Sequence, residues 1–275
     1  MNWLDSTVHR ALVEAVLVGV LGGVTGVFVV ARRLPFFTMA LTHATFPGIV
    51  VAAMLGVNLY LGGGLFGLLV VAAVLVFSRG RGQDFTTATG IALSGGFGLG
   101  VVLVSSQEGF TRDLAAYTVG DVLAVSTEDL AATAAVTAGV LLLLALLGKE
   151  LLLASFDPVG AAALGLPTVL LDFALLAVVE VTVVATVPAL GTILAVALIV
   201  GPAATARLLS DRIALLFPIA AAIGVACALA GVWVSTVWNV ATGASIALLV
   251  GLVFGTVFLA TAVRGRTRRA VPVRA

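Results

Sequence analysis

The chain has 275 residues, of which 61% are hydrophobic and only 10% are charged. Soluble domains are about 45–50% apolar and about 25% charged, so this composition excludes an ordinary soluble protein and indicates membrane-spanning helices. The single cysteine and the net charge of +1 exclude a disulfide scaffold, a zinc–thiolate cluster and an electrostatic surface for nucleic acid.

Long uncharged runs between short clusters of charge predict an all-α polytopic membrane protein with eight or nine spans. Only helices and closed barrels satisfy the backbone in lipid, and these runs lack the alternation of barrel strands. The whole chain, 1–275, is predicted to be one transmembrane domain, in which the polar segment 107–127 could re-enter the membrane and the first helix could lie partly in the interface. The predicted helices are 12–31, 37–56, 61–78, 85–106, 128–147, 169–189, 190–208, 213–232 and 242–262.

The basic residues predict the orientation, because cytoplasmic loops carry an excess of lysine and arginine. With the amino terminus outside and the carboxyl terminus in the cytoplasm, only Arg10 and Arg112 lie outside. The tail 264–275 is then a juxtamembrane basic anchor rather than a nucleic-acid arm. The cytoplasmic set is Arg32, Arg33, Arg79, Arg81, Lys149, Arg207, Arg212, Arg264, Arg266, Arg268, Arg269 and Arg274.

Glycine-rich motifs occur in the first and fourth predicted helices, at 19–23 and 95–100. Small residues let membrane helices approach closely, so these motifs predict helix packing rather than a phosphate-binding loop. No GxxxxGK[ST] motif occurs, since Gly148-Lys149 is followed by Glu150. The chain is therefore predicted to be no ATPase by itself.

The second predicted helix carries a polar strip in an apolar span. Met39, His43 and Pro47 are spaced four residues apart and share a helix face. This strip could line a translocation pathway; alternatively, His43 is a core histidine bonded to a neighbouring helix. A thioether beside an imidazole is a soft ligand pair, which suits Cu(I) better than manganese.

Glu180 is the one charged residue predicted to lie deep in the bilayer, near the centre of the sixth helix. An ionised side chain there costs about 2.5–3.5 kcal/mol on insertion scales, so Glu180 should face the bundle interior or water. It could serve a pathway, or be a protonated carboxyl that joins two helices. Asp172 is predicted to be interfacial. Pro188 and Gly201-Pro202 could break helices that line a cavity, or only kink them.

The cytoplasmic loop 149–168 is predicted to contain a short helix. Asp157 is its expected N-cap, Pro158 its first residue, and Gly165 marks its end. A short helix braced between two spans suits a protein that must receive force from a soluble partner.

Four stretches in the same order resemble the membrane permeases of bacterial zinc and manganese ABC importers, the metal-ion ABC-3 permease family. The first, 30–48, is similar to the family pattern RRxxFxxDALSHAxxPG; the others are 119–126, 155–167 and 197–209. The resemblance covers about residues 12–262.

The resemblance implies a permease subunit in the bacterial cytoplasmic membrane that pairs with a second copy. It implies two cytoplasmic ATP-binding subunits, which would bind the ATP, and an extracytoplasmic metal-binding protein. Zn²⁺ or Mn²⁺ would be transported rather than permanently bound. Phe156, Asp157, Pro158 and Gly165 would belong to the segment that couples the permease to the ATPase.

The chain departs from the family pattern at two positions. His43 matches the pathway histidine, but Met39 replaces the family aspartate, and Asp121 replaces the family asparagine. One hard ligand is therefore missing from the second helix. We hypothesise that Glu180 supplies the missing carboxylate, with Asp121 or Asp113 near the outer mouth.

Competing functions are a secondary transporter with Glu180 as proton carrier, and a vitamin or siderophore ABC permease. The first would favour an internal inverted repeat, and the two halves show no convincing similarity. A third, an intramembrane serine protease, lacks a GxSxG nucleophile motif.

Overall fold

The computed structural model describes residues 7–80, 84–106, 122 and 125–269, and the regular elements in these ranges are helices. The all-α prediction is therefore confirmed for this part of the chain. The helices are α1 (Thr7–Ala31), α2 (Pro35–Ala44), α3 (Phe46–Leu55), α4 (Leu59–Ser78), α5 (Phe85–Ser105), α7 (Thr127–Phe156), α8 (Pro158–Ala163), α9 (Thr168–Leu190), α10 (Thr192–Leu209), α11 (Ile213–Trp238) and α12 (Thr242–Arg269).

In the described ranges, eight stretches are long and apolar enough to cross a membrane, with α2 and α3 counted together. The helix α10 is shorter, with an apolar stretch of Leu194–Leu209. Helix α9 starts beside α8, and α11 starts at the same end, where Leu216 and Phe156 line one cavity. Helix α10 returns the chain between them, so the described helices make nine passes through the bundle, eight of them long and apolar enough to cross a membrane.

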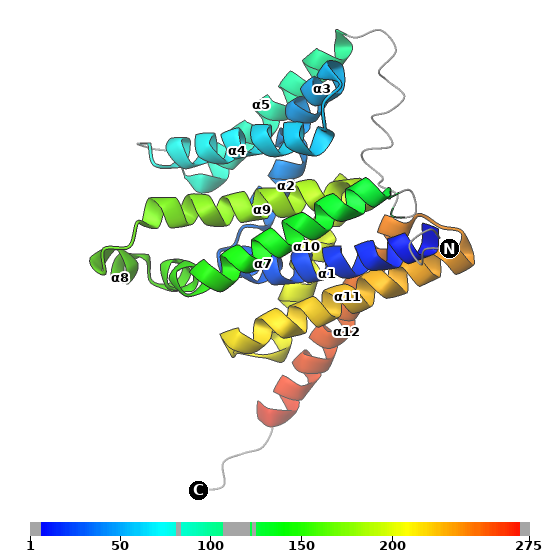
Figure 1. Ribbon diagram of the computed structural model, residues 1–275. Helices are drawn as coiled ribbons and strands as arrows, with labels where there is room; N and C mark the ends of the chain where they lie inside the picture. Colours follow the sequence, from blue (N-terminus) through cyan, green and yellow to red (C-terminus); the bar gives the residue numbers. More distant parts are fainter. Residues whose placement is uncertain (1–6, 81–83, 107–121, 123–124, 270–275) are drawn as a thin grey trace, which may run out of the picture.

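Helix α1 lies at the centre of the bundle, in contact with α7, α9, α10 and α11 (Figure 1). Helices α4 and α5 lie beyond α9, together with α3, and α12 flanks α10 and α11 on the other side. Helix α8 projects from the end of the bundle opposite the amino terminus. The first predicted helix is thus the core of the fold rather than an interfacial segment.

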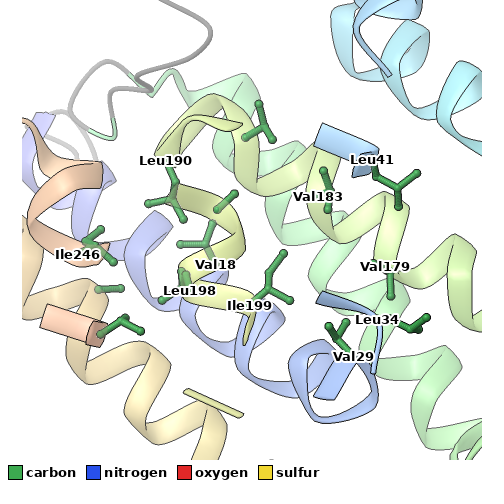
Figure 2. Packing of buried hydrophobic residues seen from close by; sticks show 14 of the residues in the cluster. Val18, Val29, Leu34, Leu41, Val179, Val183, Leu190, Leu198, Ile199 and Ile246 are labelled. Atoms are coloured by element: carbon green, nitrogen blue, oxygen red, sulfur yellow. The ribbon is translucent and has the colours of Figure 1, made fainter. Parts of the chain in front are cut away.

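The hydrophobic core lies where α1, α2, α9, α10 and α12 meet (Figure 2). Its side chains are mostly aliphatic and come from helices far apart in the sequence, so the core joins the two halves of the chain. Labelled members are Val18, Val29, Leu34, Leu41, Val179, Val183, Leu190, Leu198, Ile199 and Ile246.

The glycines of α1 allow its close contacts with α10 and α11. A Cβ built on Gly19 would lie 2.7 Å from the Val225 nitrogen, and one on Gly23 would lie 2.6 Å from the Ala220 oxygen. Both partners are backbone atoms that cannot rotate away. The predicted packing role of the 19–23 motif is therefore confirmed.

Several predicted helix ends were too early. Helix α7 continues through Lys149 and Glu150 to Phe156, so the first part of the predicted 149–168 loop is helical. Helix α12 continues to Arg269, into the predicted basic tail. Leucine, lysine, glutamate and arginine are good helix formers, so a charge at the membrane surface ends the apolar span but not the helix.

The predicted continuous helix 37–56 is wrong in one respect, because the helix is interrupted at Thr45. Pro47 occupies one of the first two positions of α3. Proline has no N–H to donate to the carbonyl four residues earlier, that of His43, and its ring crowds that carbonyl. The break therefore exposes backbone polarity in the middle of a span.

Candidate functional site

The α2–α3 break lies between α5 on one side and α4 and α9 on the other. On the α5 side, a Cβ built on Gly96 would lie 2.7 Å from the Ala44 oxygen. On the opposite side, a Cβ built on Gly67 of α4 would lie 2.8 Å from Thr45 Cγ2 and would overlap Glu180 Oε1. Glycines on both flanking helices thus let the broken segment pack tightly.

His43 is half-buried near the end of α2. Its Nδ1 lies 2.8 Å from Thr42 Oγ1 and 3.3 Å from the Met39 carbonyl oxygen. Its ring meets Phe97 of α5 edge-on, with 6.0 Å between the ring centroids. These contacts occupy Nδ1, which leaves Nε2 as the nitrogen for a ligand.

Met39 lies one turn before His43, as predicted, and its side chain is exposed in the single chain. The thioether is therefore not part of the protein core. It is accessible to a second molecule or to lipid.

Glu180 is fully buried on α9. Within the described part of the chain, neither carboxylate oxygen has a hydrogen-bond partner. The expectation that Glu180 faces the bundle interior is confirmed. A carboxyl group with two unsatisfied oxygens in an apolar bundle is costly, and such groups in membrane proteins usually serve ion or proton movement.

A small cavity of about 20 Å³ lies on the other side of the break from α5, lined by residues that include Thr45, Tyr60 and Val183. Val183 is about one helical turn from Glu180 on α9. This volume is enough for about one water molecule. The Glu180 region is therefore packed rather than open in this conformation.

The predicted site residues that the structure describes form no complete metal-ligand cluster. Among the described residues, no group of three or more histidine, cysteine, aspartate or glutamate side chains could hold a metal ion. His43 contacts α2 and Phe97 of α5, whereas Glu180 packs against α4 and the break. Asp113 and Asp121 lie outside the described residues.

A second buried carboxylate, Glu14 of α1, was missed by the sequence reasoning, so Glu180 is not the only one. Glu14 is 1% exposed; its Oε1 accepts a hydrogen bond of 2.9 Å from Thr133 Oγ1 of α7, and its Oε2 has no partner among the described residues. The predicted helix 12–31 places Glu14 in its first turn. Helix α1 starts at Thr7, about two turns before Glu14, so this side chain lies well inside the helix.

The segment 157–167 between α7 and α9 has the predicted local structure. Asp157 Oδ1 accepts a hydrogen bond of 2.8 Å from the Gly160 N–H, and Pro158 is the first residue of α8. Gly165 follows with a φ of 77°, and the Leu166 N–H reaches back to the Ala161 oxygen at 3.1 Å. This is a glycine-terminated helix end of the Schellman type.

Phe156 is exposed at the end of α7 and lines a cavity of about 160 Å³. The other walls come from α1, α10 and α11, and include Val30, Arg207 and Leu216. The segment 157–167 thus emerges beside a surface hollow, at the end of the bundle that also carries Arg207.

Comparison with known proteins gives a match along almost the whole chain. The sequence model of the ABC 3 transport family matches residues 5–261. The manganese transport system membrane protein MntC of Halalkalibacterium halodurans is 36% identical over 253 residues, which are 92% of this chain and 87% of that protein. The manganese import system permease protein ScaB of Streptococcus gordonii is 33% identical over 247 residues, covering 90% and 88%.

Two solved structures share the fold. PsaBC from Streptococcus pneumoniae, in complex with Fab, has a chain that matches with a TM-score of 0.82 and 31% identity, over 90% of each chain. A putative metal-chelate type ABC transporter in an inward-facing conformation matches with a TM-score of 0.68 and 20% identity, over 91% of this chain and 85% of that one. The second likeness concerns the fold alone.

Proposed function

Because the chain belongs to the ABC 3 transport family and is a multi-pass transport subunit, we propose that it forms the membrane pathway of an ATP-driven importer of manganese. The strongest support is the 36% identity over 253 residues with a protein named as a manganese transport system membrane protein. Zinc is the alternative cargo, since zinc also accepts imidazole and carboxylate ligands.

The proposed pathway runs past the break at Thr45. His43 offers an imidazole, and Glu180 offers two carboxylate oxygens that have no other partner among the described residues. Manganese favours carboxylate oxygen, which suits Glu180 better than the thioether of Met39. Asp121 and Asp113 would supply further carboxylates near the outer mouth.

An incomplete site suits transport, because a conduction site must release the ion as well as bind it. In the proposed cycle, a second permease copy completes the pathway, and an extracytoplasmic protein delivers the metal. Two cytoplasmic ATP-binding subunits close on ATP and shift the permease between inward-open and outward-open states. His43 and Glu180 would approach each other in only one of these states.

The test is uptake of radiolabelled manganese and zinc into ATP-loaded vesicles that carry the permease and its partner subunits. We expect manganese uptake that requires ATP. The uptake rate should fall at least about tenfold in His43→Ala and in Glu180→Ala, because replacing even a residue that only hydrogen-bonds to a metal ligand usually lowers metal affinity or activity by about 10–100-fold.

Glu14→Gln is the matched control, since Glu14 is also a buried carboxylate but bonds to Thr133 on α7. It should keep uptake close to that of the unaltered protein. Normal uptake in Glu180→Ala would refute the pathway. Uptake driven by a proton gradient without ATP would favour a secondary transporter.

The segment 157–167 is proposed to dock on the ATPase. Replacing Pro158 with Asp should leave the protein in the membrane, because Pro158 lies on an exposed helix outside the spans. We expect ATP hydrolysis to lose its dependence on metal and uptake to fall. Uptake that remains coupled to ATP in this variant would contradict the docking role.

A further inference from the structure

Asp172 lies in the second turn of α9 and joins three helices. One of its carboxylate oxygens, Oδ1, accepts from Arg32 Nη1, and the other, Oδ2, accepts from Arg79 Nη2 at 3.1 Å. Arg32 follows α1, and Arg79 caps the end of α4. The prediction that Asp172 is interfacial is consistent with its part-buried position, but its two arginine partners were not foreseen.

Arg32 also reaches the other side of the 157–167 segment. Its Nε donates to Ser155 Oγ at 2.7 Å, and Ser155 precedes Phe156 at the end of α7. A single guanidinium therefore holds Ser155, two residues before the segment, and Asp172, five residues after it. Arginine suits this role, because its planar fork carries donors in fixed, divergent directions.

The backbone fixes the position of Arg32. The Arg32 N–H donates to the Phe28 oxygen at 2.9 Å, and the Leu34 N–H donates to the Val29 oxygen at 2.8 Å. Arg33 between them has a φ of 58°, in the left-handed region that few side chains adopt. The chain thus turns sharply after Arg32, which keeps the start of its side chain at the end of α1.

Burial distinguishes the Arg32–Asp172 pair from an ordinary surface ion pair, whereas Arg79 at the edge of the cluster is 41% exposed. The side chains of Arg32 and Asp172 are 16% and 30% exposed, whereas those of Arg207 and Asp211, at the same end of the bundle, are 52% and 99% exposed and 3.9 Å apart. Exposed pairs contribute little, while breaking a buried, hydrogen-bonded pair leaves an uncompensated charge.

We propose that Arg32 fastens the end of α1 to both sides of the 157–167 segment and that Asp172 and Arg79 fasten the end of α4 to its α9 side, so that a push on α8 from an ATPase moves these helices together. This inference rests on the proposed function and adds the residues that transmit the movement. Helix α1 is the centre of the bundle, and α4 carries Gly67 against Glu180. The cluster therefore links the docking segment to both the core and the proposed pathway.

The experiment measures manganese ions taken up per ATP hydrolysed, in vesicles that contain the permease with its ATPase and binding-protein partners. Asp172→Asn keeps the shape of the side chain and removes the charge that both arginines face. We expect the ratio to fall at least about fivefold, the lower end of usual coupling between sites, while ATP hydrolysis persists. Asp211→Asn is the matched control and should leave the ratio unchanged.

Two milder variants cover the case in which Asp172→Asn does not assemble. Ser155→Ala removes no charge; it removes the hydroxyl that accepts from Arg32 and donates to the Leu151 oxygen within α7. Arg32→Lys keeps the charge but loses the fork. Both variants should lower the ratio. An unchanged ratio in the assembled variants would overturn the inference. Absence of ATP-dependent manganese uptake by the unaltered protein would instead refute the proposed function, so the two failures can be distinguished.

Discussion

Glu180 and Gly67 form a complementary pair at the residue scale. The carboxylate occupies the space that a side chain at position 67 would fill. The sequence predicted that Glu180 is buried, because an isolated charge in an apolar span must avoid lipid. It did not predict the glycine partner, since Gly67 is one of many glycines and nothing local links it to Glu180.

Gly67→Ala should therefore destabilise the protein by about 1–3 kcal/mol, the usual cost of an overpacked interior. Gly64→Ala is the control one turn earlier on α4, because no atom lies within 4 Å of its added Cβ. Thermal unfolding in detergent gives the comparison. The double variant with Glu180→Ala should recover part of the loss; equal stability of the two alanine variants would contradict the contact.

At the scale of helices, α1 packs closely against its neighbours because its glycines lie against backbone atoms of α10 and α11. This close packing explains why α1 lies at the centre of the bundle rather than in the membrane interface. The break between α2 and α3 is the other feature at this scale. The long uncharged run predicted one continuous helix, 37–56, through Pro47.

Gly23→Ala should weaken the packing of α1 against α11. The added methyl group would lie 2.6 Å from the Ala220 oxygen, a backbone atom that can yield only if the helix moves. We expect a lower unfolding temperature and less folded protein in the membrane.

Gly98→Ala on α5 is the control, because no atom lies within 4 Å of its added Cβ. This substitution should leave stability unchanged or raise it by up to about 1 kcal/mol, because alanine has less backbone freedom than glycine in the unfolded chain. Equal stability of the Gly23 and Gly98 variants would argue against the close approach.

The ends of the bundle are chemically different at the scale of the whole molecule. Arg32, Arg79 and Arg207 lie at the end that carries α8, together with Asp172. The sequence placed these three arginines on one side from charge alone. The positive-inside tendency then predicts that this end faces the cytoplasm.

Thiol labelling tests this orientation, because Cys227 is the single native cysteine and is buried. Cysteine placed at the exposed Val57, between α3 and α4, should react in intact cells with a reagent that cannot cross the membrane. Cysteine at the exposed Val159 in α8 should react only after the cells are opened. The reverse pattern would invert the assigned topology.

The sequence by itself determined the class, the position of most helices and the side on which the basic residues gather. These features depend on the free energy of placing each segment in lipid or water, which is a local property of the chain. The tertiary structure decided that Glu14 is buried as well as Glu180, that Gly67 accommodates Glu180, and that Arg32 joins Ser155 to Asp172. Such contacts depend on which helices become neighbours, and residues more than a hundred positions apart carry no local signal of that choice.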